Sequence, residues 1–555
     1  MNFKRFIPIS ILLIALLSVV SLRTPVEAQP HSSINTANTP SQPTASISFN
    51  INAAGTPINR HLLGTNLPAW INPNRTEEST LINRTVANGT PLLRIPGGSW
   101  SNGYNWLACE MGDTNNCWHA RWALHPTDFI NFLRATGTEA MYTINQGGTA
   151  KEAAALVAFF NGSVDDETVI GVDHKGQNWR TVSHWAQLRT DHGNPDPFYI
   201  QYFEIGNETY GGTTGTDCKS WGWEKKVWTC DGREYINGIG SGANRKEGFI
   251  EFRNEMRKVD PSILVGAVGV SEQSSWSNWG NEVIEEGGDV MDFYVVHQYA
   301  FDRTPSSYQD VLARPQATWG TIKADIEAAF DQHANGRSVP IAVTEYNLFS
   351  TEASANERTW MSQAVNGLFV ADTIGQMMQY GFDMANQWDI AHGEGNDLPG
   401  YGLMQADTKF RSPQYYAFPL WSRFGSQMLP VNSSPNAATE LSVYAGRIDP
   451  WTVSVMAINK TGQTINSSID LQGAPALLLG GTADVVKANS LSSTAVTFNG
   501  SNHPNDSLSN APATNLGIVT NPLMYAFAPY SITLLRLKVD EFVPTDWAYL
   551  PMVTK

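Results

Sequence analysis

Strand-like and helix-like segments alternate through most of this sequence. Longer amphipathic stretches separate eight short apolar runs, which are RHLLGTN, LLRIPGG, EAMYTIN, YIQYFEIGNE, ILVGAVG, MDFYVVHQY, VPIAVTEYN and GFDMANQWDI. Strands that alternate with helices pair in parallel, so eight such units over residues 60–428 predict an α/β fold, a (β/α)8 TIM barrel with loop insertions. A doubly wound sheet is the alternative, but the IPGG segment lacks the glycine spacing of a phosphate-binding loop.

A second pattern begins near residue 430. Short strand-like segments such as TVSVMAINK and SITLLRLKV follow one another there, separated by Gly, Asn, Ser and Pro. This pattern predicts an appended C-terminal β-sandwich domain over residues 429–538. We expect the strand-like segment at 46–59 to join this sandwich, and we assign no structure to the tail at 539–555.

The N-terminus has the pattern of an export signal. Basic residues precede the apolar run IPISILLIALLSVVSL and small residues follow it, which predicts a signal peptide over residues 1–28. Residues 29–45 are polar and rich in Pro, Ser and Thr, as in a flexible linker. No later run has the length of a membrane-spanning helix. We therefore expect a secreted or extracellular protein, and attachment of the tail to the cell surface stays open.

Charge and cysteine content narrow the classes of function. The net charge of −16 argues against a nucleic acid partner, because phosphates need clustered Lys and Arg. The four cysteines fall into two local pairs, Cys109 with Cys117 and Cys218 with Cys230. Two disulfides are the simplest interpretation, and a metal site is less favoured because no His lies near them at ligand spacing. The oligomeric state stays open.

Polar residues stand where most of the predicted barrel strands end. The carboxyl ends of the strands carry the active site of a (β/α)8 barrel. At these ends lie Arg94, Asn145, Asn207, Glu208, His297, Tyr299, Glu345, Gln387 and Trp388. A single Glu at a strand end would ordinarily meet solvent. Glu208 and Glu345, however, end strands 4 and 7, which face each other across the barrel, so the pair can flank one bond.

Two carboxyl groups on either side of a bond are what glycoside hydrolysis requires. One must be protonated to donate to the leaving oxygen, and the other must be ionised to attack the sugar; different surroundings separate their pKa values. We predict that Glu208 is the acid/base and Glu345 the nucleophile, about 5–5.5 Å apart as in a retaining enzyme. Because two carboxyl groups and water suffice, we expect no metal and no organic cofactor.

The other residues at the strand ends are predicted to bind substrate or to tune the two acids. We expect Asn207 to bind the sugar 2-hydroxyl and Arg94 to help keep Glu345 ionised. We expect Tyr299 to orient Glu345, and His297 to tune this network rather than act as a base. The remaining predicted substrate-binding residues are Gln387 and Trp388.

Several of these segments resemble motifs of glycoside hydrolase family 51, the α-L-arabinofuranosidases; they are LLRIPGGSWSNGYNW, FEIGNETYG, DFYVVHQYA and IAVTEYN. The resemblance extends over roughly residues 45–535. It implies a retaining hydrolase of arabinose-containing polysaccharides or oligosaccharides, with Glu208 as acid/base and Glu345 as nucleophile. It also implies that the substrate pocket includes Arg94, Asn207, Tyr299 and Gln387.

Two positions depart from the family pattern. Ser99 follows PGG, where the family commonly has Asn, and Asn66 ends the first strand, where the family uses Glu. Fewer polar contacts to sugar hydroxyls alter specificity. Alternatives therefore stay open: an endo-β-glucanase, a xylanase or a β-glucuronidase of the same clan, or a non-catalytic carbohydrate-binding protein. The presence of both Glu residues disfavours the binding protein, and the lack of HxH and HExxH motifs disfavours a metal-dependent hydrolase.

Tryptophans gather near both cysteine pairs, in the loops predicted after strands 2 and 4. They are Trp106, Trp118, Trp221, Trp223 and Trp228. Such residues on the catalytic face can form stacking platforms for sugars, or they can simply pack the loops down. The sequence favours neither interpretation.

Overall fold

The computed structural model describes residues 44–117, 123–212, 224, 226–352 and 354–539. The predicted signal peptide, nearly all of the predicted linker and nearly all of the tail lie outside these residues. None of the helices within the described ranges combines the length and the apolar character that crossing a bilayer requires.

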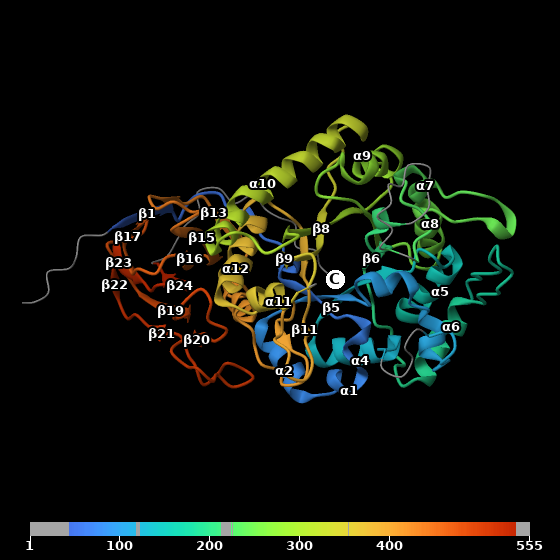
Figure 1. Ribbon diagram of the computed structural model, residues 1–555, viewed down its shortest axis with the longest axis horizontal. Coiled ribbons are helices and arrows are strands. Elements are labelled where there is room, and N and C mark those ends of the chain that lie inside the picture. Colours follow the sequence, from blue (N-terminus) through green and yellow to red (C-terminus); the bar gives the residue numbers. More distant parts are fainter. Residues whose placement is uncertain (1–43, 118–122, 213–223, 225, 353, 540–555) are drawn as a thin grey trace, which may run out of the picture. The chain divides into compact units, whose positions relative to one another are not determined.

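Eight parallel strands close into a barrel, which confirms the predicted TIM barrel (Figure 1). In order around the barrel they are β10 (Met384–Gln387), β3 (Gly64–Asn66), β4 (Leu92–Ile95), β5 (Glu139–Ile144), β6 (Tyr202–Ile205), β7 (Leu264–Val268), β8 (Phe293–Phe301) and β9 (Ile341–Phe349). β9 pairs with β10 and closes the ring. The first strand is shorter than predicted, because Arg60–Leu63 form a 3-10 helix before it.

The barrel interior changes from apolar to polar along the strands. Toward the amino ends, Leu92, Met141 and Phe293 belong to a buried apolar cluster. Side chains two residues apart on a strand point to the same face, so Arg94 follows Leu92 on β4 and Thr143 follows Met141 on β5. These later positions are buried and polar. Buried polar groups need hydrogen-bond partners, and they find them in one another at the carboxyl ends.

Helices surround the barrel (Figure 1). The long ones are α2 (Ser79–Asn88), α4 (Pro126–Thr136), α5 (Ala150–Asn161), α6 (Val182–Asp191), α8 (Phe249–Val259), α9 (Ser275–Gly287), α10 (Tyr308–His333) and α12 (Ala364–Gln379). The short ones are α1 (Pro73–Thr76), α3 (Trp106–Glu110), α7 (Gly232–Asn237), α11 (Ala355–Met361) and α13 (Ala417–Trp421). Their ends follow ordinary capping rules: the Thr149 hydroxyl accepts from the backbone N–H of Glu152 at the start of α5.

The C-terminal region forms two packed sheets, which confirms the appended β domain. One sheet has the order β14 (Asn432–Ser433), β1 (Ala45–Asn50), β17 (Ile465–Gln472) and β23 (Leu523–Phe527). The other has the order β2 (Thr56–Pro57), β13 (Gln427–Leu429), β15 (Leu441–Asp449), β16 (Thr452–Asn459), β24 (Ser531–Lys538), β19 (Gly480–Lys487) and β20 (Thr497–Phe498), and β21 (Thr514–Asn515) pairs with β19. Phe49 of β1 and Val455 of β16 share one apolar core.

Pairing between distant segments completes the β structure. β1 follows the predicted linker and pairs in parallel with β17. Two small sheets join β11 (Ala391–His392) to β12 (Met404–Gln405), and β18 (Leu477–Leu478) to β22 (Val519–Thr520). The limits proposed for the individual domains stay a prediction.

A buried ion pair links the β domain to the barrel helices. Lys460 follows β16, and its Nζ donates to Asp372 Oδ2 on α12 at 2.8 Å and to the backbone carbonyl oxygens of Leu312 and Ala437. Asp372 also accepts from the Tyr444 hydroxyl at 2.6 Å. Both charged side chains are fully enclosed. Removing one partner would therefore leave the other as an unpaired buried charge.

One of the two predicted disulfides lies within the described residues. Cys109, on α3, is bonded to Cys117, which confirms the first predicted pair. Cys218 lies outside the described residues. Its pairing with Cys230 therefore stays a prediction.

Candidate active site

The two predicted catalytic carboxyl groups meet at the carboxyl ends of the barrel strands. After β6, the chain passes through two residues with left-handed backbone angles, Gly206 (φ 86°) and Glu208 (φ 44°). Glycine suits the first position because an added Cβ would lie 2.5 Å from the Thr209 side chain. A residue other than glycine seldom adopts this conformation. At Glu208 the turn brings the side chain next to Glu345 of β9.

Glu208, His297 and Glu345 converge on a single point. One polar atom of each side chain lies within 4.8 Å of those of the other two. The carboxyl pair is therefore close enough for double displacement, for which the groups lie about 5–5.5 Å apart. The Glu208 side chain is 21% exposed and that of Glu345 is 6% exposed, so the predicted acid is the one that a leaving group and water can reach.

Arg94 forms the floor of the site. Its buried guanidinium donates from Nη1 to Glu345 Oε1 (2.9 Å) and Asn66 Oδ1 (3.0 Å), from Nη2 to Asn207 Oδ1 (2.8 Å), and from Nε to Glu204. A planar guanidinium imposes directions as well as charge. Arg94 therefore fixes one oxygen of Glu345 and places a positive charge against it.

Tyr299 and His297 contact the remaining oxygens of the pair. The Tyr299 hydroxyl donates to Glu345 Oε2 at 2.7 Å. Burial raises the pKa of Tyr299 well above its usual value, and the charge of Glu345 adds to this effect, so Tyr299 stays a donor. His297 Nδ1 lies 3.0 Å from Glu208 Oε1. Burial lowers the pKa of His297, but the negative charge of Glu345 and the contact with Glu208 outweigh burial and raise it above the usual value.

Glu208, His297 and Glu345 are also close enough together to bind a metal ion. A metal needs an unprotonated imidazole nitrogen. The pKa of His297 is raised, and its Nδ1 already faces Glu208. These side chains therefore fit an acid pair better than a metal site, and the expectation that the protein needs no metal stays a prediction.

A third carboxyl group, which the sequence did not indicate, binds the Asn207 amide. Glu224 Oε1 accepts from Asn207 Nδ2 at 3.3 Å and from the Ser99 hydroxyl. Glu224 Oε2 accepts from Asn102 Nδ2 at 2.9 Å. The residue is only 2% exposed. Asn207 is therefore held at both ends of its amide, by Arg94 at the oxygen and by Glu224 at the nitrogen.

The surroundings of Glu224 change its acidity. Burial raises its pKa to about 7, and the charge of Glu208 contributes in the same direction, whereas the hydrogen bonds that Glu224 accepts oppose the shift. At neutral pH the group is near the midpoint of its titration. Glu224 lies between Cys218 and Cys230, in a segment with no strand or helix pattern, so neither periodicity nor spacing could identify it.

The two positions that depart from the family pattern have different surroundings. Asn66 is buried, and its Oδ1 accepts from Arg94. Its Nδ2 donates to the backbone carbonyl oxygen of Thr344 at 3.0 Å. Ser99 is exposed, and its hydroxyl donates to Glu224. Both the oxygen and the nitrogen of the Asn66 amide are therefore bonded to groups of the protein. The Ser99 hydroxyl is bonded to the carboxyl group of Glu224.

Gln387 lies beneath the site and is fully buried. Its Oε1 accepts from the Thr65 hydroxyl at 2.9 Å, and its Nε2 donates to the backbone carbonyl oxygens of Trp388 and Tyr401, each at 2.7 Å. These contacts do not support the predicted direct binding of substrate. The reason is that the protein already satisfies the amide, which instead fixes the segment carrying Trp388.

Trp388 belongs to an aromatic wall beside the PGG segment. Its ring lies 5.6 Å from that of Trp70, which in turn lies 5.2 Å from the ring of Trp100, measured between centroids. An added Cβ on Gly98 would lie 2.5 Å from the Trp388 ring, so the glycine permits this close approach. The predicted role of Trp388 in substrate binding stays a prediction, and Trp70 and Trp100 are neighbours that sequence reasoning missed.

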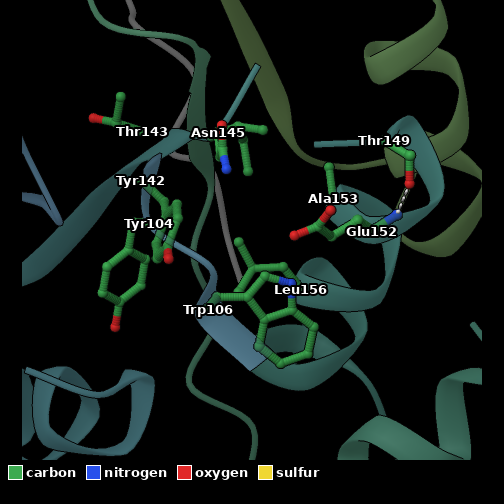
Figure 2. Close-up of a pocket in the computed structure, with 10 residues that line it drawn as sticks. Tyr104, Trp106, Tyr142, Thr143, Asn145, Thr149, Glu152, Ala153 and Leu156 are labelled. Carbon is green, nitrogen blue, oxygen red and sulfur yellow. Dashed lines mark hydrogen bonds between the residues drawn. The ribbon is translucent and has the colours of Figure 1, made fainter. Parts of the chain in front are cut away.

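The predicted tryptophan platform is not supported at Trp106. This residue is buried against Trp185 and Phe159. Figure 2 shows it lining a small cavity beside Leu156 of α5, and Asn145 lines the same cavity. Trp106 therefore packs its loop down. Trp118, Trp221 and Trp223 lie outside the described residues, and Trp228 is half-buried.

Comparison with known proteins agrees with this geometry. A family model described as "Alpha-L-arabinofuranosidase 1 domain" matches residues 89–314. An intracellular exo-α-(1→5)-L-arabinofuranosidase of Halalkalibacterium halodurans is 25% identical over 295 residues, 49% of this chain and 49% of that protein. Enzyme 1 of the same name from Bacillus subtilis is 23% identical over 425 residues, 69% of this chain and 75% of that protein. The chain is similar to the glycoside hydrolases of family 51.

A solved structure resembles the fold of most of this chain. The α-L-arabinofuranosidase of Thermotoga maritima, in complex with arabinose, has a TM-score of 0.67 at 19% identity. The alignment covers 89% of this chain and all of that one, and it shows a shared fold. The matched part of the H. halodurans relative is about half of its length, 49%. The activity of the whole protein is therefore proposed below.

The relatives also correct the expected localisation. The matched proteins of H. halodurans, B. subtilis and Bifidobacterium longum are named intracellular enzymes. The prediction of a secreted or extracellular protein, and with it attachment to the cell surface, is wrong. It depended on an apolar N-terminal pattern at 1–28, which lies outside the described residues.

Proposed function

We propose that the family 51-like enzyme is a retaining α-L-arabinofuranosidase that acts on arabinose-containing polysaccharides or oligosaccharides. The observation that carries the proposal is the carboxyl pair of Glu208 and Glu345, with oxygens within 4.8 Å of each other. The family model and the curated relatives support the choice of sugar. The buried Arg94, which donates to Glu345, supports the assignment of Glu345 as the nucleophile.

In the first step, the Glu345 carboxylate attacks the anomeric carbon of the sugar. The bond to the leaving oxygen breaks as Glu208 donates its proton to that oxygen. Arg94 and Tyr299 bind the two oxygens of Glu345, which holds the nucleophile in one orientation. The products of this step are a glycosyl ester on Glu345 and a free alcohol.

In the second step, water releases the sugar. Glu208, now ionised, takes a proton from a water molecule whose oxygen attacks the anomeric carbon, and Glu345 leaves as a carboxylate. The partial exposure of Glu208 gives water access to it. Two successive inversions at the anomeric carbon return the original configuration, so the product retains its anomeric form.

His297 is placed to follow the negative charge as it moves between the two acids. Its Nδ1 lies 3.0 Å from Glu208 and 3.7 Å from Glu345. In the first step the charge leaves Glu345 and appears on Glu208. The Tyr210 hydroxyl also donates to Glu208 Oε1, at 3.1 Å. Both contacts stabilise the ionised form of Glu208 that the second step needs.

A second candidate is a β-glycosidase or β-glycanase of the same clan. The specific observation in its favour is that Asn66 bonds to Arg94 and to backbone, while Ser99 bonds to Glu224. Side chains already occupied in this way offer less to a furanose. The same carboxyl pair would then act on a pyranoside such as a glucoside, a xyloside or a glucuronide.

A panel of 4-nitrophenyl glycosides tests the proposal. It compares the α-L-arabinofuranoside with the β-glucoside, β-xyloside and β-glucuronide, and uses Glu345→Ala as the control. We expect a clear preference for the arabinofuranoside and a loss of at least ~10³-fold in kcat for Glu345→Ala. Activity of that variant near the wild-type level would refute the mechanism. Preference for a β-pyranoside would refute the sugar and leave the mechanism standing.

A further inference from the structure

Glu224 is a buried carboxyl group next to the site, and the proposed mechanism does not use it. It faces three uncharged donors: the Ser99 hydroxyl and the side-chain amides of Asn102 and Asn207. A carboxyl group that is 98% buried is costly unless each oxygen is hydrogen-bonded. Both oxygens of Glu224 accept hydrogen bonds, so the carboxyl group is held in one position.

The contacts of Glu224 determine which way the Asn207 amide faces. An Asn side chain can turn by half a rotation, which exchanges its oxygen and its nitrogen. In the observed orientation Oδ1 accepts from Arg94 and Nδ2 donates to Glu224. In the reversed orientation an N–H would face the guanidinium and an oxygen would face the carboxylate. Glu224 and Arg94 together therefore select one orientation.

Asn102 ties this arrangement to the backbone. Its Nδ2 donates both to Glu224 and to the carbonyl oxygen of Asn207 (2.7 Å). Its Oδ1 accepts from the backbone N–H of Asn207 at 3.0 Å. Glu224, Asn102 and Asn207 are thus linked in a closed ring of hydrogen bonds. Glu208 is the next residue in the chain, so the ring also supports the turn that aims the acid/base.

We propose that Glu224 is a positioning residue that locks the Asn207 amide, so that its second N–H faces the 2-hydroxyl of the sugar bound between the two catalytic acids. The inference rests on the proposed glycosidase function. The amide nitrogen carries two hydrogens, and the contact with Glu224 uses one of them. Glu224 acts on the bound sugar through its contact with Asn207.

The ionisation of Glu224 fits this role. Burial raises its pKa to about 7, and Glu208 is the charged neighbour that adds to the shift. As a carboxylate, Glu224 offers acceptor oxygens to all three donors. When it is protonated, one of them must accept instead, and the Ser99 hydroxyl is the one that can turn to do so. A carboxylate accepts hydrogen bonds more strongly than the neutral acid does, so the contact with Asn207 is strongest above about pH 7.

The test compares substrates with and without the 2-hydroxyl. For wild type, Glu224→Ala and Glu224→Gln, kcat and KM are measured on the best glycoside of the panel and on its 2-deoxy counterpart. Hydrogen bonds to the 2-hydroxyl strengthen in the transition state of glycosidases, so we expect wild type to lose about 10²-fold or more in kcat/KM on the 2-deoxy substrate. We expect Glu224→Ala to lose less than about tenfold, because Asn207 no longer faces the hydroxyl.

Two variants keep the test specific. Glu224→Gln preserves volume, but its amide cannot accept from both Asn102 and Asn207, so we expect an intermediate dependence on the hydroxyl. Ser99→Ala removes a donor to Glu224 and leaves the Asn207 contact, so we expect it to keep the wild-type ratio between the two substrates. Circular dichroism establishes that each variant is folded, and Glu224→Gln provides the ratio if Glu224→Ala does not fold.

The possible failures are distinguishable. An active wild-type enzyme whose dependence on the 2-hydroxyl is unchanged in both Glu224 variants would overturn the inference and leave the proposed function standing. A folded wild-type enzyme that hydrolyses none of the glycosides would overturn the proposed function, and the inference with it. A change confined to KM on both substrates alike would also contradict the inference, because it would show a general packing role.

Discussion

Two buried cations in this molecule have different surroundings and different roles. Arg94, at the carboxyl ends of the barrel strands, donates to the side chains of Glu204, Glu345, Asn66 and Asn207. Lys460, between the β domain and the barrel helices, donates to Asp372 and otherwise to backbone carbonyl oxygens. Neither cation is exposed to solvent.

The comparison shows what each type of cation can fix. A guanidinium is a planar fork, so Arg94 sets the directions of several side chains, two of which belong to the proposed reaction. An ammonium is a point charge, and apart from Asp372 the groups around Lys460 are backbone carbonyl oxygens rather than side chains. We therefore expect changes at Arg94 to appear in the rate of the reaction, and changes at Lys460 to appear in the stability of the fold.

The largest effect on stability is expected for Lys460→Met. The change leaves Asp372 buried without its cation, which costs about 3–5 kcal/mol. We expect kcat of the folded variant to stay within about twofold of wild type, because no catalytic group contacts this pair. Denaturant unfolding and steady-state kinetics measure the two quantities. Asp372→Asn added to Lys460→Met should restore part of the stability, and a tenfold loss in kcat without a loss in stability would reverse the comparison.

The reaction should be sensitive to Arg94→Lys. Lysine keeps the positive charge but cannot contact Glu345, Asn66 and Asn207 at once. We expect kcat/KM to fall by about 10²–10³-fold, the range seen when a preorganised electrostatic contact is lost. The loss in unfolding free energy should be smaller than that of Lys460→Met, because a charge remains. Activity within tenfold of wild type would show that the fork geometry does not matter.

The acidity of Glu224 predicts a change in stability with pH. Its pKa is about 7 in the folded protein and about 4.5 in the unfolded chain, so the folded state holds the proton more tightly between these values. The group's contribution to stability is present below about pH 4.5 and is lost as the pH rises through 7. The unfolding free energy of Glu224→Gln should therefore gain about 3 kcal/mol relative to wild type between pH 4.5 and 8. Parallel stability curves for the two proteins would contradict the shift.

The smallest effect is expected for Tyr299→Phe. It removes the donor to Glu345 Oε2 and leaves the contact with Arg94. One hydrogen bond to a charged group is worth about 1.5–3 kcal/mol, so we expect kcat to fall by about 10–100-fold. Tyr346→Phe is the matched control, because among the described residues the Tyr346 hydroxyl has no hydrogen-bond partner. Equal losses in the two variants would show that the contact with Glu345 is not special.

The parts of the molecule whose residues follow a regular apolar–polar pattern could be predicted from the sequence. The alternation of apolar runs and amphipathic stretches specified the barrel, and the strand ends then specified Glu208, Glu345 and Arg94. The contact from Arg94 to Glu345 and that from Tyr299 to Glu345 follow from the same geometry, because adjacent and facing strands end at one rim.

Other features depended on contacts that no period reveals. Glu224 comes from a segment whose sequence has no strand or helix pattern, and only the folded chain shows that it reaches Asn207. Gln387 does end a barrel strand, but a strand end does not tell whether the amide faces a substrate or the backbone of the next loop. Lys460 follows a strand of the β domain, and its partner Asp372 lies 88 residues away in the sequence.

Trapping of the glycosyl-enzyme intermediate determines whether Glu345 is the nucleophile. A 2-deoxy-2-fluoro glycoside of the preferred sugar, with a good leaving group, slows the second step, and peptide mass spectrometry then locates the attached sugar. We predict that the sugar is attached to the peptide that contains Glu345, and that the product is released with retained configuration. A label on Glu208, or an inverted product without any labelled peptide, would contradict it.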